Sequence, residues 1–421
     1  MTHPSDRVRT SERFATGAWL SGSLMTFTAG IMIAGTVVGL GFLLISATGT
    51  VDVYGRPVGT DFSSFWSAGV MALAGHAPQS YDWSAHSEVL RQWLGTKEYY
   101  PWSYPPVFLL VAAALAMLPY LPALVAWQAT TMLAVLGTLW AIVPRWRALM
   151  LGIGFPGVLI CLGHGQTGFL TAALLTGGIL ALARREVLAG VLFGLLVYKP
   201  QFGLLLPFIL AAGGYWRAFA AAAVTALVVV AVTLFVWGWP VWQAFLNSTH
   251  LTRTIVFETG DTGFEKFQSA FAWMRLWGGS LTLAYGLQAV VATGVLISCI
   301  RIWRGDVDLR LKGAALLVGT LLSSPYVLDY DFIPLGMAIA LVAAHGLDRG
   351  FQPWDKTLLA IAWFTPLVAR TIAKSVYLPV GFLMLAALFV LIVVRARGMP
   401  EVATPGLRVS GGERYAASSS R

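Results

Sequence analysis

The sequence predicts an all-α polytopic membrane protein, and two features of its composition predict this class. Hydrophobic residues make up 57% of the 421 residues and charged residues only 11%, whereas about a quarter of an average soluble domain is charged. The basic residues are concentrated in short segments between apolar runs and near the two ends of the chain. This placement is typical of cytoplasmic loops, so the net charge of +9 does not indicate a nucleic-acid partner.

The apolar runs predict the order of the membrane segments. Residues 1–20 are polar and form an expected cytoplasmic tail, and residues 23–47 are apolar for longer than a signal-peptide core of about 7–15 residues. We therefore expect an uncleaved first crossing at the start of a membrane domain over residues 21–398. Further apolar runs follow near residues 105–119, 123–143, 148–163, 167–183, 186–198, 202–214, 216–237, 281–302, 311–325, 331–346, 355–372 and 375–394. Residues 399–421 are rich in Gly, Ser and Ala and predict a disordered cytoplasmic tail.

Charge placement decides how these runs cross the membrane. If 105–119 is a re-entrant or interfacial helix, almost every later basic cluster faces the cytoplasm, and if it crosses, almost every one faces outward. The clusters lie at 144–147, 183–186, 215–218, 301–312, 348–356 and 394–398. We therefore predict about 12 crossings, in a range of about 11–13, with both termini inside. Extracytoplasmic loops are expected at 48–104, which would carry interfacial helices, and at 238–280.

The segment between the clusters at 183–186 and 215–218 has to enter the membrane and return. Its midpoint is "VYKPQFG", where Pro200 removes a backbone donor and clashes with the preceding turn. Two short helices are therefore expected to meet at Lys199-Pro200-Gln201. A cation inside an apolar segment costs about 2.5–3.5 kcal/mol on insertion scales. Lys199 is thus either a side chain that snorkels to the interface or a contact for a phosphate.

"RPVGTDFSSFWSAG", residues 56–69, places Asp61 directly before an apolar, aromatic helix. One interpretation is a helix N-cap formed by Thr60 or Asp61. The other is a general base held near the membrane surface. The two roles are compatible, since a capping residue is also well fixed.

Three more polar clusters fall on the same predicted outer face. "GHGQ" puts His164 and Gln166 in a turn that either caps helices or donates hydrogen bonds to a sugar or phosphate. Asp329 and Asp331 in "LDYDF" start a helix, either as caps or as substrate contacts. The polar segment 247–269 is mostly expected to be solvated, and His250 and Arg253 are its residues to test.

Neither a nucleotide site nor a metal site is indicated by the sequence. There is no Gly-rich phosphate loop with its lysine, no GxGxxG that opens a helix after a strand, and no His, Cys and acidic set with metal-ligand spacing. Cys161 and Cys299 lie in apolar runs and are expected to be small buried residues. We therefore expect no cofactor and no metal, and a donor carried by a lipid rather than by a cytosolic nucleotide.

The order of "GTDFSSFWSAG", "YPP", "GHGQTGFL" and "VYKPQFG" resembles the GT-C glycosyltransferases. It is most similar to glycosyltransferase family 87, the polyprenyl-phosphate-mannose-dependent mannosyltransferases, over roughly residues 20–345. The resemblance implies an inverting enzyme of the bacterial inner membrane. It would move a hexose, namely mannose, from a polyprenyl phosphate to a lipid or glycan acceptor on the extracytoplasmic face, with membrane lipids as its other partners.

The resemblance also implies roles for the polar residues. Asp61 corresponds to the catalytic base, and "HGQ" and "KPQ" match recurring family motifs. The residues expected at the donor phosphate are Lys199, Gln201, His164, Gln166, Arg253 and His250. The residues expected to line the substrate are Trp66, Trp102, Tyr104, Asp329 and Asp331. Two aspartates stand near 324–331, where the family pattern leads us to expect a basic residue or histidine.

The alternative to a transferase is a secondary transporter or flippase for a lipid-linked or anionic substrate, because broken helices with a buried lysine are typical of transporters. A scaffold without chemistry is a third interpretation. The sequence shows no repeated halves, and its polar groups gather on one face rather than at mid-membrane depth. An acid held near the bilayer in the first loop also has no purpose in a scaffold, so a transferase is favoured.

Overall fold

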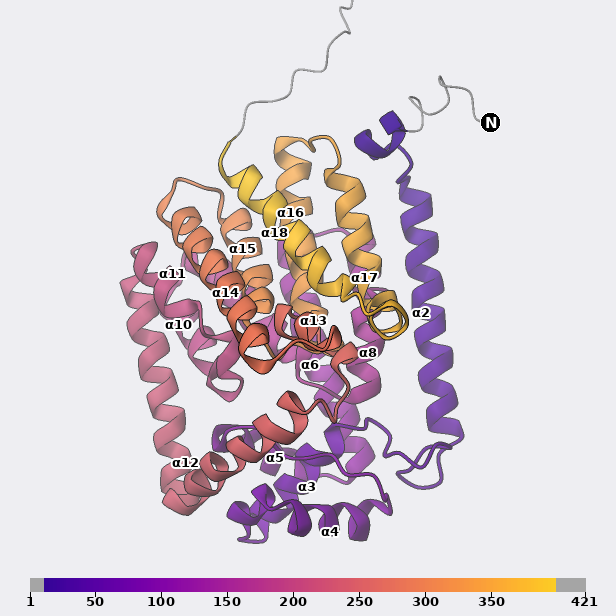
Figure 1. The fold of residues 1–421 in the computed structure, drawn as a ribbon, viewed down its shortest axis with the longest axis vertical. Helices are drawn as coiled ribbons and strands as arrows, with labels where there is room; N and C mark the ends of the chain where they lie inside the picture. The colour runs from indigo at the N-terminus through magenta and orange to yellow at the C-terminus, as the bar shows by residue number, and fades with distance from the viewer. Residues whose placement is uncertain (1–10, 399–421) are drawn as a thin grey trace, which may run out of the picture.

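A computed structural model describes residues 11–398 of the chain, and Figure 1 shows an elongated bundle of helices. The predicted all-α class is confirmed. Within 11–398 the only extended pairings are isolated bridges between Thr48 and Val51, Val51 and Pro57, and Phe267 and Leu328. The expected disordered tail at 399–421 and the first half of the expected N-terminal tail lie outside the described residues.

The α-helices follow one another with short connections. They are α2 (Gly22–Ile45), α3 (Phe62–Leu73), α4 (Trp83–Leu94), α5 (Leu109–Ala116), α6 (Tyr120–Ile142), α7 (Trp146–Ile153), α8 (Pro156–His164), α9 (Gly168–Leu182), α10 (Glu186–Gly194), α11 (Leu206–Ala212), α12 (Trp216–Leu251), α13 (Ala270–Leu276), α14 (Leu281–Arg304), α15 (Leu309–Ser323), α16 (Ile333–Arg349), α17 (Asp355–Val376) and α18 (Val380–Ala396). Tighter 3-10 segments are η1 (Ala77–Tyr81), η2 (Pro106–Phe108), η3 (Leu195–Tyr198), η4 (Pro200–Phe202), η6 (Phe264–Lys266) and η7 (Asp329–Phe332), and η5 (Thr252–Glu258) is a π-helix.

Fewer helices than expected are long enough to cross a bilayer alone. Among the described residues, six helices meet the length and hydropathy of a span, or seven if the α7–α8 pair, bent by 52°, counts as one. The expected 12 crossings are therefore not confirmed. The reason is that breaks divide several apolar runs: α9 has only 15 residues, and the run before Pro200 ends in a 3-10 turn. A full span needs about 20 residues.

The run at 105–119 forms a short helix. It begins at Pro106 with η2 and ends at Ala116 in α5, where the carbonyl of Leu118 accepts a hydrogen bond from the Trp66 indole at 2.9 Å. Eleven residues rise about 16 Å, roughly half of a hydrocarbon core of about 30 Å. This length agrees with a segment that does not span, although its place in a membrane stays a prediction.

The two ends of the described chain lie at the same end of the bundle, at the top of Figure 1. The carbonyl of Ala15 accepts a hydrogen bond from the Trp354 amide at 2.6 Å, just before α17. Asp355, the first residue of α17, pairs at 2.5 Å with Arg395 near the end of α18. These contacts bring the N-terminal segment and the end of α18 together, as a chain with both termini on one side requires.

Much of the segment 238–280, predicted as an extracytoplasmic loop, is helical, and its side of the membrane stays a prediction. Gly238 has a φ of +73°, a left-handed conformation that residues with a side chain rarely adopt, and Pro240 follows in the next turn. The chain changes direction there and continues as helix to Leu251, then as the π-helix and α13. In Figure 1 this part of α12 runs across the lower end of the bundle. The first loop carries α3, η1 and α4 as expected, but their interfacial position is untested.

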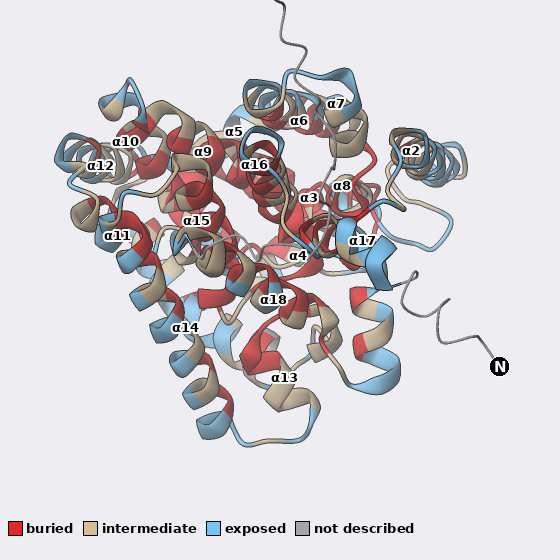
Figure 2. Ribbon diagram, turned by 90° about the horizontal axis from the view of Figure 1, so that it is seen from above, coloured by how far each residue is buried: buried red, intermediate tan, exposed pale blue. Residues whose placement is uncertain are grey.

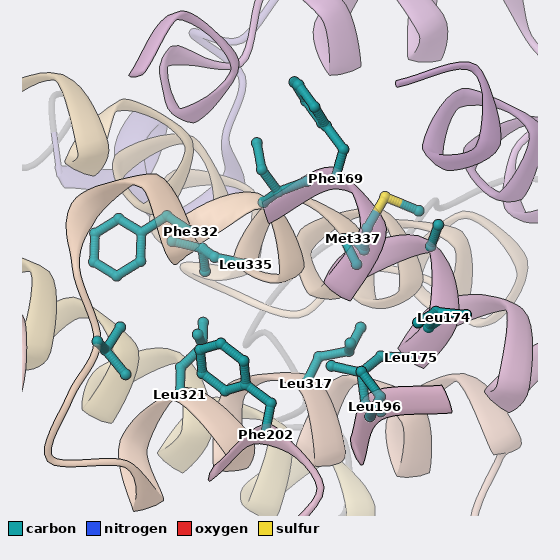
Figure 3. Close-up of a cluster of buried hydrophobic side chains, with 14 of the residues drawn as sticks. Phe169, Leu174, Leu175, Leu196, Phe202, Leu317, Leu321, Phe332, Leu335 and Met337 are labelled. Carbon is teal, nitrogen blue, oxygen red and sulfur yellow. The ribbon is translucent and has the colours of Figure 1, made fainter. Parts of the chain in front are cut away.

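A packed apolar core supports the centre of the bundle. Figure 2 shows buried positions along α9, α15 and α16, whereas α2 and α12 stand at the edges with mostly exposed or intermediate positions. Figure 3 shows part of the core, where side chains from α9, the η3–η4 segment, α15 and α16 meet. These are the elements that begin or end at the predicted polar motifs, so the core fixes where the motifs lie.

We expect the sidedness of the basic turns to decide the topology. Arg147 and Arg184 are exposed, Lys97 is exposed in the first loop, and the two cysteines are buried. Single cysteines at Arg147 and Arg184 should resist a membrane-impermeant maleimide in intact cells, and a cysteine at Lys97 should react. Reaction of both arginine positions from outside would mean that 105–119 crosses.

Gly69 is expected to hold α3 against α5. A Cβ at Gly69 would lie 2.1 Å from the Ala112 carbonyl oxygen, so Gly69→Ala must push the two helices apart. Overpacking of this kind costs about 1–3 kcal/mol, and the thermal midpoint in detergent should fall. Gly137→Ala on α6, with no atom within 4 Å of the added Cβ, is the matched control. Equal midpoints for the two variants would contradict the close packing of α3.

Candidate active site

The helix break predicted at Lys199 is confirmed. The chain leaves helical geometry at Lys199, with φ −139° and ψ 68°, and resumes a 3-10 turn at Pro200. Because proline cannot donate a backbone hydrogen bond, the break occurs where the sequence places it. The Lys199 side chain is buried, so it does not snorkel to a solvent-exposed position.

Lys199 forms a buried ion pair with Asp331. Its Nζ lies 2.5 Å from the Asp331 Oδ1, and the two side chains are only 5% and 1% exposed. The other carboxylate oxygen of Asp331 accepts a hydrogen bond from the Leu328 amide at 3.2 Å, and the rings of Phe202 and Tyr330 lie 4.9 and 5.6 Å from the ammonium. The Asp331 carboxylate therefore caps the start of η7, as one of its two predicted roles requires, and its role as a substrate contact stays a prediction.

The "GHGQ" motif forms the turn between α8 and α9. Gly165 has a φ of +66°, and a Cβ there would lie 2.5 Å from the Phe62 Cβ and 3.1 Å from the Gly59 carbonyl oxygen. Only glycine allows this close approach to the start of α3. The Trp127 indole donates to the Gly165 carbonyl at 3.1 Å and fixes the turn. The motif is therefore placed directly against the segment that carries Asp61.

Asp61 precedes α3, but its carboxylate does not cap the helix. Instead, the Gln166 Nε2 donates to the Asp61 Oδ2 at 2.8 Å, and His164 Nδ1 lies 3.9 Å from the same oxygen. His164 Nδ1 is within hydrogen-bond distance of the Thr60 hydroxyl, at 2.8 Å. The Asp61 side chain is 23% exposed. The carboxylate is thus held by its neighbours while remaining accessible.

A continuous set of polar contacts joins Asp61 to the buried ion pair, and we call it the Asp61–Lys199 network. The Gln166 Oε1 accepts from the Tyr104 hydroxyl at 2.9 Å and from the Thr167 amide at 3.1 Å. The Thr167 hydroxyl lies 3.3 Å from the Tyr104 hydroxyl and accepts from Lys199 Nζ at 3.4 Å. Five sequence-distant segments therefore meet at one place, and each side chain limits the orientation of the next.

Tyrosines surround the Asp61 carboxylate. Burial, and next the charge of Asp61, raise the pKa of the Tyr100 phenol well above its usual range, so this tyrosine stays protonated at neutral pH. A protonated phenol can donate a hydrogen bond but cannot act as a base there.

A cavity of about 410 Å³ adjoins the network. Thr60 and His164 form the wall nearest Asp61, and its other polar lining residues are Asp52, Tyr54, Arg56, Asp329, Arg370 and Thr371. Arg370 NH2 lies 2.6 Å from the Asp329 Oδ2. This volume is within the usual range of small-molecule sites, about 300–1,000 Å³. The cavity is therefore large enough for part of a substrate, and it lies next to Asp61 in the chain, although Asp61 is not one of its lining residues.

The structure brings together only some of the predicted donor-site residues. His164, Gln166 and Lys199 lie at the site with Asp61. Gln201 is half-buried in the turn after Lys199 and is not a member of the network. His250 is exposed on the second part of α12, and Arg253 pairs at 3.0 Å with Glu258, which accepts from the Tyr285 hydroxyl at 2.8 Å. The roles predicted for His250 and Arg253 stay predictions.

The predicted substrate-lining aromatics pack within the protein. Trp66 and Trp102 are 6% and 1% exposed, and Tyr104 is half-buried between the Phe65, Phe108 and Tyr198 rings. Tyr104 nevertheless reaches the network through its hydroxyl. Stacking of these rings on a sugar stays a prediction, while their packing around α3 is evident.

Sequence reasoning missed three residues of the site. Thr167 follows the predicted motif and bridges it to Lys199, and Tyr330 lies between His164 and Lys199, with ring-to-ring and ring-to-ammonium distances of 5.7 and 5.6 Å. Arg370 stands in an apolar run, "TPLVARTIA", where an arginine is as unusual as Lys199 is in its own run. That anomaly was a usable signal for Arg370.

No group of three or more metal-ligating side chains is found over residues 11–398. The expectation of a reaction without a metal or cofactor stays a prediction.

Comparison with known proteins gives the class of this protein. A family model for glycosyltransferase family 87 matches residues 102–325, slightly more than half of the chain. Together with the apolar helical bundle, this match identifies an integral membrane glycosyltransferase. The chain belongs to glycosyltransferase family 87, a GT-C type family. No curated protein and no solved structure gave a match.

The buried ion pair leads to a stability prediction. Lys199→Met leaves the Asp331 carboxylate buried and unpaired, and breaking such a pair costs about 3–5 kcal/mol. The double variant Lys199→Met, Asp331→Asn restores neutrality and should regain most of the lost thermal midpoint. Arg253→Met, which breaks an ion pair whose arginine is 63% exposed, should change the midpoint little. A double variant as unstable as the single one would show that the pair is not the source of the loss.

Proposed function

We propose that this enzyme transfers a hexose, namely mannose, from a polyprenyl-phosphate donor to a hydroxyl of a lipid or glycan acceptor, on the extracytoplasmic face of a bacterial cytoplasmic membrane. The observation that carries the proposal concerns the Asp61 carboxylate. It does not cap a helix, it is partly accessible, and Gln166 holds it in place by a hydrogen bond. Family membership supports glycosyl transfer, and the absence of nucleotide motifs from the sequence favours a lipid-linked donor.

In this proposal Asp61 is the general base. Its carboxylate accepts the proton of the acceptor hydroxyl, the hydroxyl oxygen bonds to the anomeric carbon, and the bond from that carbon to the phosphate oxygen breaks. The electron pair of the broken bond stays on the lipid phosphate. A single displacement of this kind inverts the anomeric configuration, and positive charge develops on the sugar ring as in other glycosyl transfers.

The Asp61–Lys199 network supports the base by orientation. The Gln166 amide donates to one carboxylate oxygen at 2.8 Å, so the second oxygen is left to face the acceptor. Tyr104 and Thr167 fix the Gln166 carboxamide from the other side. Effective base catalysis requires this fixed geometry, because the base has to lie roughly 2.6–3.2 Å from the proton-bearing oxygen.

The buried helix break also occurs in transporters, so transport has to be measured alongside transfer. Purified protein in vesicles, given a radiolabelled polyprenyl-phosphate mannose and a crude lipid acceptor, should release polyprenyl phosphate and label the acceptor. Movement of the intact labelled lipid between leaflets without label transfer would support the transporter interpretation instead.

We expect Asp61→Asn to abolish most transfer while preserving the fold. The asparagine oxygen can still accept from Gln166 but cannot take a proton, and positioned base catalysis is worth about 10²–10⁴-fold. The rate of sugar transfer by the purified variant should therefore fall by about that factor.

The control for this variant is Asp82→Asn. Asp82 is an exposed aspartate of the same loop and caps α4 through the Ala85 amide at 2.8 Å, a role that asparagine also fills. Both variants should keep the wild-type thermal midpoint and donor affinity. Transfer by Asp61→Asn at close to the wild-type rate would remove Asp61 from the mechanism.

A further inference from the structure

The cavity beside the site has a lining that is partly polar and partly aliphatic. Thr60, His164 and Arg370 belong to the polar part, and Leu43 of α2 and Leu367 of α17 belong to the aliphatic part. One continuous space therefore offers both hydrogen-bonding groups and aliphatic side chains. A lipid with a charged headgroup likewise combines a polar group with an aliphatic chain.

The aliphatic part of the lining comes from two helices that stand apart. The helix α2 packs mainly against α7 and α8, and Figures 1 and 2 show α2 separated from α17. Side chains on α2 near Leu43 are exposed and apolar, among them Val38 and Phe42, and Leu367 is exposed on α17. In a membrane these faces contact lipid, so a lipid chain can reach the cavity from the side.

Arg370 is one of two cations that line the cavity, and the other, Arg56, is exposed in the first loop. One of the terminal nitrogens of Arg370 contacts Asp329 at 2.6 Å, while its Nε is buried and has no partner among the described residues. The Oδ1 of Asp329 is also buried without a partner. A buried polar atom without a hydrogen bond costs about 1–3 kcal/mol. The Arg370 side chain as a whole is 38% exposed, so its guanidinium is accessible to a phosphate, which guanidinium binds well through paired hydrogen bonds.

Lys199, the predicted phosphate contact, is less suited to this role. Its ammonium is already paired with Asp331 at 2.5 Å and is only 5% exposed, whereas the Arg370 side chain is 38% exposed. Arg370 also lies outside the residues 102–325 matched by the family model, so its role is not carried over from the family.

We propose that the groove between α2, α8 and α17 admits the lipid-linked donor laterally from the membrane and that Arg370 binds its phosphate, with Asp329 as the counter-ion that orients the guanidinium. The proposal deepens the proposed function and rests on it for the sugar carried by the lipid. Arg370 then also stabilises the negative charge that the phosphate gains when the sugar leaves. Lys199 is a positioning residue that acts on Asp61 through Thr167 and Gln166.

Binding of sugar-free polyprenyl phosphate tests the groove independently of sugar transfer. Arg370→Gln with Asp329→Asn keeps the pair neutral and should lower the affinity for polyprenyl phosphate by about 10- to 100-fold, the value of hydrogen bonds to a charged group. The affinity for polyprenol, which lacks the phosphate, should not change. Leu367→Trp places a bulky side chain in the aliphatic part of the cavity lining. It should weaken the binding of polyprenyl phosphate and of polyprenol, whereas the affinity for a short-chain isoprenyl phosphate should not change.

Lys374→Gln is the control, since this exposed lysine lies one turn beyond Arg370 on α17 and does not line the cavity. It should bind polyprenyl phosphate like the wild type. Wild-type affinity in the Arg370 double variant would overturn the phosphate site, and wild-type affinity in Leu367→Trp would overturn the lateral groove. If these losses occur while no sugar is transferred, the lipid site stands and the proposed function fails.

Discussion

Lys199 and Asp331 meet in the interior as a lysine and an aspartate that are each almost wholly removed from solvent. Neither charge is tolerable there alone, because the desolvation of a single buried ion costs several kcal/mol. The pair therefore requires that the break at Pro200 and the start of α16 lie side by side. The apolar core shown in Figure 3 packs on the same elements, so apolar packing and charge neutralisation impose one arrangement.

The Lys199–Asp331 pair also fixes the orientation of the residues that contact Asp61. Thr167 contacts the ammonium, and the carboxamide of Gln166, the residue directly before it in the chain, holds Asp61. Gly165 lets the turn approach the start of α3 closely enough for that contact. A rigid interior thus orients a carboxylate that is itself partly exposed, which is the division of roles that a positioned base needs.

The sequence predicted the identity of the site residues better than it predicted which of them contact one another. Asp61, His164, Gln166, Lys199 and Asp331 were all recognisable because each is polar beside an apolar run. Hydropathy reports depth in a membrane and carries no information on which helices are neighbours, so the partner of Lys199 was not predictable. The helix after Gly238 was missed because Gly and Pro signal a turn equally well in a loop and at a kink. The predicted number of crossings was not confirmed for a related reason, since short broken helices and full spans have similar composition.

The separation of the ion-paired residues along the chain has a consequence for biosynthesis. Asp331 follows Lys199 by 132 residues, which at about 5–20 residues per second takes roughly 7–26 s to translate. During that interval the segment around Lys199 has already left the ribosome and has no carboxylate to meet. The nascent protein must then keep this amine hydrated or uncharged, in the translocation channel or at the bilayer surface, until the second half of the chain arrives. Completion of the interior is therefore a late event, and truncated chains that end before Asp331 present an unpaired lysine to membrane quality control.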